Sequence, residues 1–168
     1  MASAHDNLLA ELRLTLRAGT HEDIAALHGL IGGIRKSYGL SLPRTARDDD
    51  LLDVERWYGS RRGMFAVLED RSGVLVGCCG AYAGETPKTC VLRRLYVAYK
   101  MRHRGLGQLL MEHALDWARA QGFESVDLSV DQVFREGIRM YEKYGFVRHV
   151  HVGEHGAAAC DLHFSLRV

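Results

Sequence analysis

The chain has 168 residues, of which 47% are hydrophobic and 26% charged, and its formal net charge is +1. This size and composition predict one globular domain over residues 1–168, and the small net charge argues against a general nucleic-acid or membrane-surface binder. No apolar run approaches the roughly 18 residues of a membrane span, and residues 1–6 lack the basic and apolar regions of a signal peptide. We therefore expect a cytoplasmic protein that binds neither nucleic acid nor membrane.

The first part of the chain predicts a strand followed by a helix. Residues 1–10 are polar and are expected to be loose. Leucines alternate with polar residues over 12–16, which is typical of a half-buried strand. A capping box over residues 20–23 precedes apolar residues at helical spacing from Ile24 to Ile34. Glycines weaken this helix, so we expect it to fray beyond Gly32.

A second helix is predicted after a connection over residues 38–47. Asp48, Asp49 and Asp50 precede apolar residues that reach Trp57, and acidic residues favour a helix N-terminus. We therefore interpret the three carboxylates as a solvated helix start. A metal site is the less favoured alternative, because no second carboxylate cluster lies nearby in the sequence.

The remaining chain predicts six strands and two helices. In order, these are a hairpin over 64–68 and 74–82, a strand over 89–97, a helix over 106–122, a strand over 125–130, a short helix over 138–145, and a terminal hairpin over 146–152 and 160–168. The strand, helix and strand from 91 to 130 form a βαβ unit, whose strands should be parallel with a right-handed crossover. The whole order predicts an α+β fold with a mixed, mostly antiparallel sheet of about seven strands and about four helices.

The four cysteines predict no metal or redox site. Cys78 and Cys79 are adjacent, and Cys90 and Cys160 lie in strand-like runs without CxxC spacing. They are interpreted as small, reduced core residues. A catalytic thiol, which would need a setting that lowers its pKa, is the minor alternative.

A basic, glycine-containing loop opens the helix that starts near residue 106. The sequence Arg102-His103-Arg104-Gly105-Leu106-Gly107 follows an apolar strand, and a helix N-terminus offers unpaired N–H groups to an anion. It does not match a Walker loop, which needs Lys and then Ser or Thr after its second glycine, nor the dinucleotide fingerprint, which needs a third glycine or alanine. The alternative is a tight turn with exposed arginines.

Two motifs together resemble a known family. Leu95-Tyr96-Val97, then Arg102-x-x-Gly105-x-Gly107 opening a helix, and later Tyr141-Glu142-Lys143-Tyr144-Gly145-Phe146 are similar to the GNAT superfamily of acyl-CoA-dependent N-acyltransferases. The motif-bearing part covers about residues 89–149, and the upstream order of elements also matches that fold. The resemblance implies a sheet splayed between strands 89–97 and 125–130, with acetyl-CoA in the V-shaped gap between them.

The resemblance also assigns roles to individual residues. The amides of residues 102–107 would bind the pyrophosphate, and the backbone of Leu95 and Val97 would pair with the pantetheine arm. The backbone amide of Val97 would stabilise the oxyanion, and Tyr141 would protonate the departing thiolate. The implied cofactor-binding residues are Leu95, Val97, Arg102, His103, Arg104, Gly105, Leu106, Gly107, Phe134 and Tyr141. The acceptor would be a primary amine of a small molecule or peptide that attacks directly, with no metal, in a monomer or a homodimer.

The sequence departs from the family pattern in several places. Val91 stands where many members carry the Glu that takes a proton from the incoming ammonium, so Glu85, Asp131 or a histidine would have to replace it. Phe134 stands in place of a common Asn, and Gly137 in place of a common Ala. Tyr99 occupies a position where many members have Pro, which should alter only the loop.

These departures leave alternatives open. A CoA-binding module or sensor without efficient transfer is the second hypothesis, and a general phosphate-binding protein is the third. A metal site on the terminal hairpin is a minor alternative, because its spacing fits no familiar pattern. Its residues would be His149, His151, His155, Cys160 and His163. The basic group of Arg56, Arg61 and Arg62 is interpreted as solvated, with recruitment of an acidic acceptor as the minor alternative.

Overall fold

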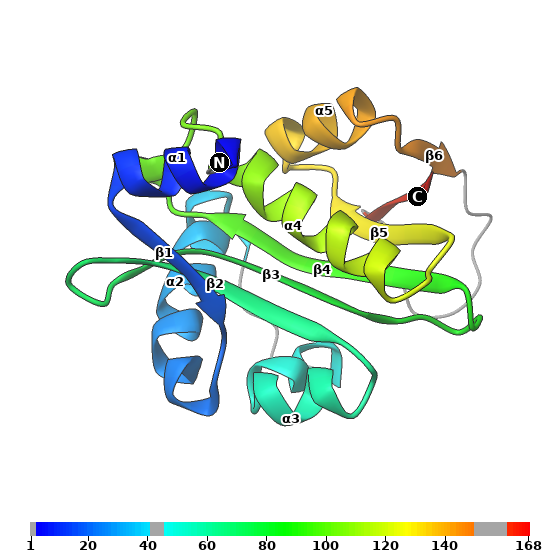
Figure 1. The fold of residues 1–168 in the computed structure, drawn as a ribbon, viewed down its shortest axis with the longest axis horizontal. Coiled ribbons are helices and arrows are strands. Elements are labelled where there is room, and N and C mark those ends of the chain that lie inside the picture. Colours follow the sequence, from blue (N-terminus) through cyan, green and yellow to red (C-terminus); the bar gives the residue numbers. More distant parts are fainter. Residues whose placement is uncertain (1–2, 41–45, 150–160) are drawn as a thin grey trace.

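The fold is built on one twisted sheet of seven strands (Figure 1). The computed structural model describes residues 3–40, 46–149 and 161–168. The strands are β1 (Leu14–Ala18), β2 (Met64–Asp70), β3 (Leu75–Ala83), β4 (Thr89–Val97), β5 (Ser125–Asp131), β6 (Val147–His149) and β7 (Asp161–Arg167), in the order β1-β2-β3-β4-β5-β7-β6. Only β4 and β5 pair in parallel within this described sheet. The predicted α+β fold is confirmed.

Helices cover both faces of the sheet. They are α1 (Ala4–Leu12), α2 (Ile24–Ser37), α3 (Val54–Gly59), α4 (Leu106–Ala120) and α5 (Arg135–Lys143), with short 3-10 turns η1 (His21–Asp23), η2 (Ala46–Leu51) and η3 (Tyr99–Met101). Side chains of α1, α4 and α5 join one hydrophobic cluster, and those of α2, η2 and α3 join a second. Figure 1 shows these two groups of helices on opposite sides of the sheet.

Residues 4–12 form helix α1, whereas we expected the N-terminal residues 1–10 to be loose. Ser3 and Asp6 form a capping box at the start of α1, which extends to Leu12, so the first strand begins only at Leu14. His5 Nε2 lies 2.5 Å from Glu112 Oε2 on α4, and leucines of α1 pack against the first cluster. Long-range contacts of its leucines and of His5 therefore hold this helix in place.

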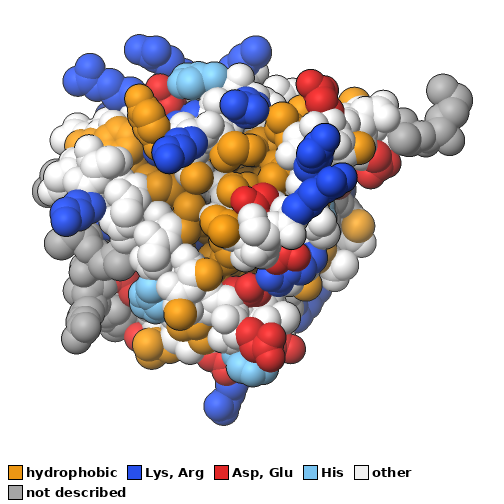
Figure 2. Space-filling view, turned by 90° about the vertical axis from the view of Figure 1, so that its left-hand side faces the viewer, with side chains coloured by type: hydrophobic (Ala, Val, Ile, Leu, Met, Phe, Trp, Pro, Cys, Tyr) orange, Lys and Arg blue, Asp and Glu red, His pale blue; other side chains and the backbone are white. Residues whose placement is uncertain are grey.

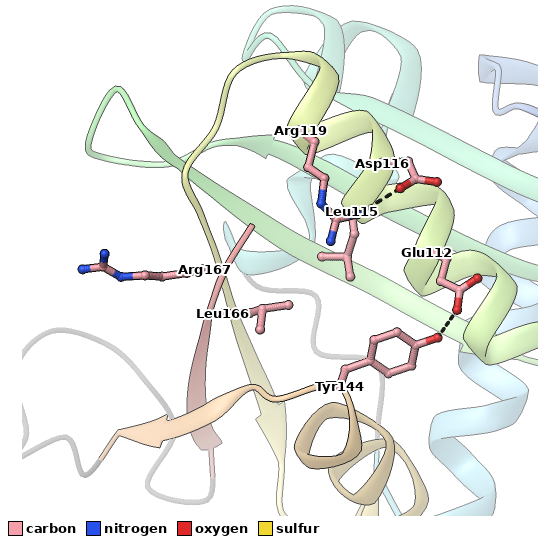
Figure 3. Close-up of a pocket in the computed structure, with 7 residues that line it drawn as sticks. All are labelled: Glu112, Leu115, Asp116, Arg119, Tyr144, Leu166 and Arg167. Atoms are coloured by element: carbon pink, nitrogen blue, oxygen red, sulfur yellow. Dashed lines mark hydrogen bonds and ion pairs between the residues drawn. The ribbon is translucent and has the colours of Figure 1, made fainter.

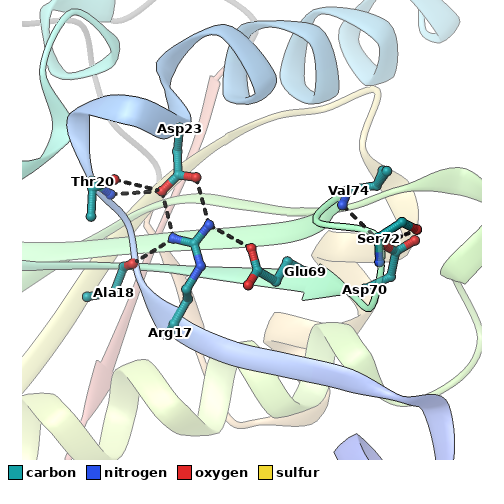
Figure 4. Close-up of polar contacts among 8 residues, drawn as sticks. All are labelled: Arg17, Ala18, Thr20, Asp23, Glu69, Asp70, Ser72 and Val74. Carbon is teal, nitrogen blue, oxygen red and sulfur yellow. Dashed lines mark hydrogen bonds and ion pairs between the residues drawn. The ribbon is translucent and has the colours of Figure 1, made fainter.

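Helix α2 is longer than predicted and is anchored at its beginning. It continues past Gly32 to Ser37. Before it, Arg17 on β1 binds both carboxylate oxygens of Asp23 at 2.8 Å and Glu69 on β2 at 2.7 Å (Figure 4). This network joins the edge of the sheet to the start of the helix, which fixes where α2 leaves the sheet.

The run of three aspartates does not form a solvated helix start. Residues 46–51 form the 3-10 turn η2, and α3 begins only at Val54 with Asp53 as its N-cap. Asp50 is fully buried, where Arg94 donates to it at 2.7 and 3.0 Å and the Tyr58 hydroxyl donates at 2.9 Å. The prediction was wrong because the partner of Asp50 lies 44 residues away in the sequence, which a local pattern cannot show.

Surface polarity is uneven around the molecule. Figure 2, which views the left-hand side of Figure 1, shows hydrophobic side chains gathered near the middle of that face with charged side chains around them. Among the described residues, no helix is long and apolar enough to cross a bilayer.

The three described cysteines are buried, and burial raises the pKa of the Cys79 and Cys90 thiols to about 12, as expected for core residues.

Candidate active site

Strands β4 and β5 separate at the centre of the sheet. Their parallel pairing runs from Thr89 and Ser125 to Leu92 and Leu128 and extends no further among the described residues. Beyond that point β4 continues to pair with β3, and β5 continues to pair with β7. The two strands thus leave a V-shaped gap whose β4 side is bare backbone.

The backbone polar groups of Leu95 and Val97 point into this gap. The N–H of Ala98 donates to Val76 on β3 at 2.8 Å, and successive strand residues turn their polar groups to opposite edges. Val97 and Leu95 therefore face the β5 side. On that side the Val97 carbonyl accepts a hydrogen bond from Arg102 Nε at 3.2 Å. The Val97 N–H is directed at the gap.

A bulge in β4 precedes these residues. The pairing register with β3 shifts between Cys78 and Gly80, and Arg94 has a left-handed φ of 58°. Because the bulge adds one residue, Arg93 and Arg94 follow each other on the side of η2 and both approach Asp50. The bulge therefore places two guanidinium groups at the mouth of the gap.

Helix α4 begins at the end of the gap. Gly105, its N-cap, has a φ of 80°, a conformation that glycine adopts without strain, and Leu106 is the first helical residue. No side chain caps this helix, so its first N–H groups remain available to an anion. The anion site expected from the sequence would be formed by these N–H groups.

A cavity of about 1460 Å³ joins the gap to the start of α4. Every residue expected to bind the cofactor lines it except Arg104, which is exposed and lies outside its wall. Arg102 lines it, but its Nε donates to the Val97 carbonyl at 3.2 Å and its Nη1 to the Tyr38 hydroxyl at 2.8 Å, so only part of its guanidinium is left for an anion. The backbone N–H groups at the start of α4 are therefore the leading candidates to bind an anion.

Tyr141 projects from α5 into the same cavity. Its side chain is 7% exposed and packs edge-on to Phe146 and against Phe164. Burial raises the pKa of the phenol above its usual value, with a smaller effect from Tyr96. The hydroxyl therefore stays protonated at neutral pH, which suits a proton donor.

An aromatic wall borders the cavity between α2 and α5. The Phe134 ring lies 4.8 Å from that of Tyr38 and 6.1 Å from that of Tyr96, measured between centroids. All three residues line the cavity. Phe134, which stands in place of the Asn implied by the resemblance, is thus part of an aromatic surface that joins α2, β4 and α5.

The expected candidates for a base are divided by the structure. Asp131, His103 and His163 line the cavity, as does Val91 at the position of the missing Glu, whereas Glu85 does not. His103 is mostly exposed and lies 3.7 Å from Glu136, and His163 Nδ1 bonds Ser129 at 2.8 Å. Two residues that the sequence analysis did not single out for the site, Asp48 and Arg93, also line the wall. The sequence signal that could have identified Arg93 as a residue of the site is the pair of adjacent arginines in an otherwise apolar strand.

The metal alternatives receive no support from the part of the chain that is described. No group of three or more His, Cys, Asp or Glu side chains is arranged there to hold a metal ion. His149 and His163 are paired on β6 and β7, while His151, His155 and Cys160 lie outside the described residues. The Asp48–Asp50 run is occupied by arginine partners.

Sequence comparison decides the family. A profile of the acetyltransferase (GNAT) family matches residues 33–146, which include the gap, the loop and Tyr141. The chain belongs to the GNAT acetyltransferase family. An uncharacterised N-acetyltransferase of Schizosaccharomyces pombe is 27% identical over 74% of this chain and 77% of its own length.

Other relatives are longer than this GNAT chain. The probable N-acetyltransferase camello of Xenopus tropicalis is 27% identical over 82% of the chain, and the match spans 58% of that protein. The N-acetylaspartate synthetase of the same organism is 32% identical over 63% of the chain and 39% of its own length.

Solved structures share the fold. A GNAT-family acetyltransferase of Staphylococcus aureus superposes with a TM-score of 0.81 at 16% identity, covering 92% of this chain and 98% of that one. The yncA protein of Salmonella typhimurium, solved with its cofactor acetyl-CoA, gives 0.68 at 21% identity over 92% and 94% of the two chains. The GNAT fold is thus shown independently of the sequence motifs.

One departure from the GNAT pattern is structurally mild. A Cβ atom placed on Gly137 would lie 3.7 Å from Tyr141 Cε2 and 3.9 Å from its hydroxyl oxygen, which are ordinary contacts. The alanine common in the family would therefore fit, and its absence leaves the Tyr141 pocket slightly wider. Tyr99 is 78% exposed in η3, away from the cavity wall.

A second, smaller cavity lies on the outer side of α4 in this GNAT domain. It has a volume of about 420 Å³ and lies between α4, Tyr144 and the end of β7 (Figure 3). Four of its polar side chains are paired with one another: Tyr144 donates to Glu112, and Arg119 binds Asp116 at 2.9 Å. It contains none of the expected cofactor residues, so the larger cavity is the candidate active site.

Proposed function

We propose that this protein transfers the acetyl group of acetyl-CoA to a primary amine by direct attack in a ternary complex. The observation that carries the proposal is the V-shaped gap, in which the Leu95 and Val97 backbone, the α4 N-terminus and Tyr141 border one cavity. Its dimensions suit an extended cofactor with an anionic end. Membership of the GNAT family supports the same reaction.

The cofactor would be held mainly by backbone. In the proposed complex the pyrophosphate lies at the N–H groups of residues 105–107, where the helix dipole favours negative charge. The pantetheine arm pairs with Leu95 and Val97 as an added strand would. Neither contact needs a metal or a covalent bond to the protein.

The chemistry would follow from two groups. The Val97 N–H polarises the thioester carbonyl and stabilises the oxyanion that forms when the amine nitrogen attacks the carbon. As the carbon–sulfur bond breaks, Tyr141 gives its proton to the CoA thiolate. The ammonium loses two protons overall: one replaces that of Tyr141 and the other reaches solvent.

The test is release of CoA thiol from acetyl-CoA in the presence of amino acids, polyamines, aminoglycosides and peptides. One relative is named an N-acetylaspartate synthetase, so amino acids belong in the panel. We expect thiol release above background with at least one class and an acetylated product by mass spectrometry. Binding of acetyl-CoA without release by any amine would instead support the sensor hypothesis, for which Val91 and Phe134 are the motivating residues.

A further inference from the structure

The acceptor side of the cavity carries a compact cluster of opposite charges. Asp48 and Asp50 come from η2, and Arg93 and Arg94 come from the bulge of β4. Arg94 Nη2 joins both carboxylates, at 2.5 Å to Asp48 Oδ1 and 2.7 Å to Asp50 Oδ1. The four formal charges sum to zero, so the cluster attracts neither a simple cation nor a simple anion through net charge.

One end of this cluster lacks a hydrogen-bond donor. Asp48 Oδ2 is buried and has no hydrogen-bond partner in the structure, although its side chain is 14% exposed and lines the cavity. Buried carboxylate oxygens are nearly always satisfied, so an orphan oxygen at a cavity wall indicates a donor that arrives with a ligand. Its sister oxygen is held by Arg94, which fixes the carboxylate.

The other end has donors to spare. The Arg93 side chain is 25% exposed and lines the cavity, where it approaches Asp50 at 3.6 Å and the Trp57 ring at 5.8 Å. Within the described chain it makes no hydrogen bond, yet a guanidinium carries five N–H donors in a planar fork. Asp50 already receives two bonds from Arg94 and one from Tyr58, so Arg93 is available to a carboxylate.

The three other carboxylates on the wall, Asp131, Glu136 and Asp161, each have interactions of their own. Asp131 Oδ1 accepts the Val133 N–H at 3.0 Å, and Glu136 lies near Arg102 and His103 beside the α4 N-terminus. Glu136 therefore belongs to the cofactor end of the cavity. Asp48 is the wall carboxylate held at the β4 bulge, by Arg94 at 2.5 Å. Val91 and Tyr82 also line the wall and face each other on β4 and β3.

We propose that Asp48 and Arg93 form the acceptor subsite and that the acceptor is a free amino acid, a zwitterion whose ammonium and carboxylate lie close together. The ammonium satisfies Asp48 Oδ2, and the carboxylate binds the Arg93 fork. Because the ligand brings both charges, the subsite stays neutral when it is filled. This inference rests on the proposed acetyl transfer and specifies its substrate class.

The experiment compares matched acceptors in the wild-type protein. Free L-amino acids, their C-terminal amides and the corresponding decarboxylated amines are assayed for thiol release with saturating acetyl-CoA. We expect kcat/KM for the preferred amino acid to exceed that of its amide by about tenfold or more, which is the usual effect of a charged hydrogen bond. Equal or higher values for amides or polyamines would overturn the amino-acid assignment while leaving acetyl transfer intact.

Variants then test the Asp48 and Arg93 ends of the subsite separately. Arg93→Gln should raise KM about tenfold for the free amino acid and leave KM for its amide nearly unchanged, whereas Asp48→Asn should raise KM for both. Arg61→Gln and Asp49→Asn are the controls, since Arg61 stacks on the same Trp57 ring at 3.9 Å and Asp49 is exposed beside Asp48, both outside the cavity wall. An Arg93 variant that affects amide and acid equally would contradict the subsite. If no amine is acetylated although acetyl-CoA binds, the proposed function fails and the inference falls with it.

Discussion

At the scale of single residues, the motif positions were predictable and their partners were not. Leu95, Val97 and Tyr141 could be placed from the sequence because each belongs to a short local pattern, and all three line the cavity. The positions of Asp48 and Arg93 depend on the bulge in β4 and on contacts between η2 and β4. Such contacts join residues more than 40 positions apart, beyond the reach of any local pattern.

Tyr141→Phe should lower turnover and leave cofactor affinity nearly unchanged. The substitution removes the proton donor but keeps the ring that packs against Phe146 and Phe164. We expect kcat to fall about 100-fold or more, as is usual when a general acid is lost. Steady-state kinetics and titration of acetyl-CoA measure the two effects. Unchanged kcat under conditions where chemistry limits the rate would remove Tyr141 from this role.

At the scale of elements, helix α4 carries the cofactor end of the site. Its start was predictable because glycines and apolar periodicity are local signals, and the structure confirms a helix from Leu106. Helix α1 was missed because the contacts that hold it, of its leucines with the first cluster and of His5 with Glu112, join residues far apart in the sequence. The distinction is between helices specified by their own sequence and helices stabilised by tertiary packing.

Gly107→Val should weaken acetyl-CoA binding in a folded protein. A Cβ atom at this position meets only the Met140 thioether, at 3.5 Å, so the helix tolerates it, but the side chain crowds the pyrophosphate site. We expect the Kd to rise about tenfold, equivalent to losing one charge-assisted hydrogen bond, with a smaller rise for Gly107→Ala. Calorimetric titration gives both values. Wild-type affinity in the valine variant would contradict the anion site.

Gly29→Ala and Gly33→Ala should each stabilise helix α2. Both glycines lie within the helix, and a Cβ atom on either would meet no other atom within 4 Å. Alanine restricts the unfolded chain and favours the helix by up to about 1 kcal/mol. Thermal unfolding measures this as a higher Tm. A lower Tm would contradict the open space that the structure shows around both glycines.

At the scale of the whole molecule, a buried ionic cluster joins the sheet to the helical layer formed by η2 and α3. Burial opposes the charge of Asp50, but the hydrogen bonds and charge of Arg94 outweigh it and hold the pKa of this carboxyl below its usual value. A depressed pKa in the folded state adds stability that is complete above about pH 4 and disappears as the pH falls through the folded value.

Asp50→Asn should therefore reduce stability most at neutral pH. Leaving Arg94 without its main partner in the interior should cost about 3–5 kcal/mol of unfolding free energy. The difference from wild type should shrink as the pH is lowered below about 4, because the Asp50 carboxylate is protonated first in the unfolded chain and then, below its lowered folded pKa, in the native protein. Urea unfolding across this pH range measures it, with exposed Asp49→Asn as the control. A constant difference at all pH values would contradict the role of the charge.

The central claim is that one cavity holds acetyl-CoA in the gap between β4 and β5 and presents its acetyl group to an amine. A crystal structure with acetyl-CoA and an unreactive amine analogue tests it most directly. We expect the pyrophosphate at the N–H groups of residues 105–107, the thioester carbonyl at the Val97 N–H, and the sulfur beside Tyr141. Cofactor bound outside this gap, or with its acetyl group directed away from Tyr141, would contradict the account.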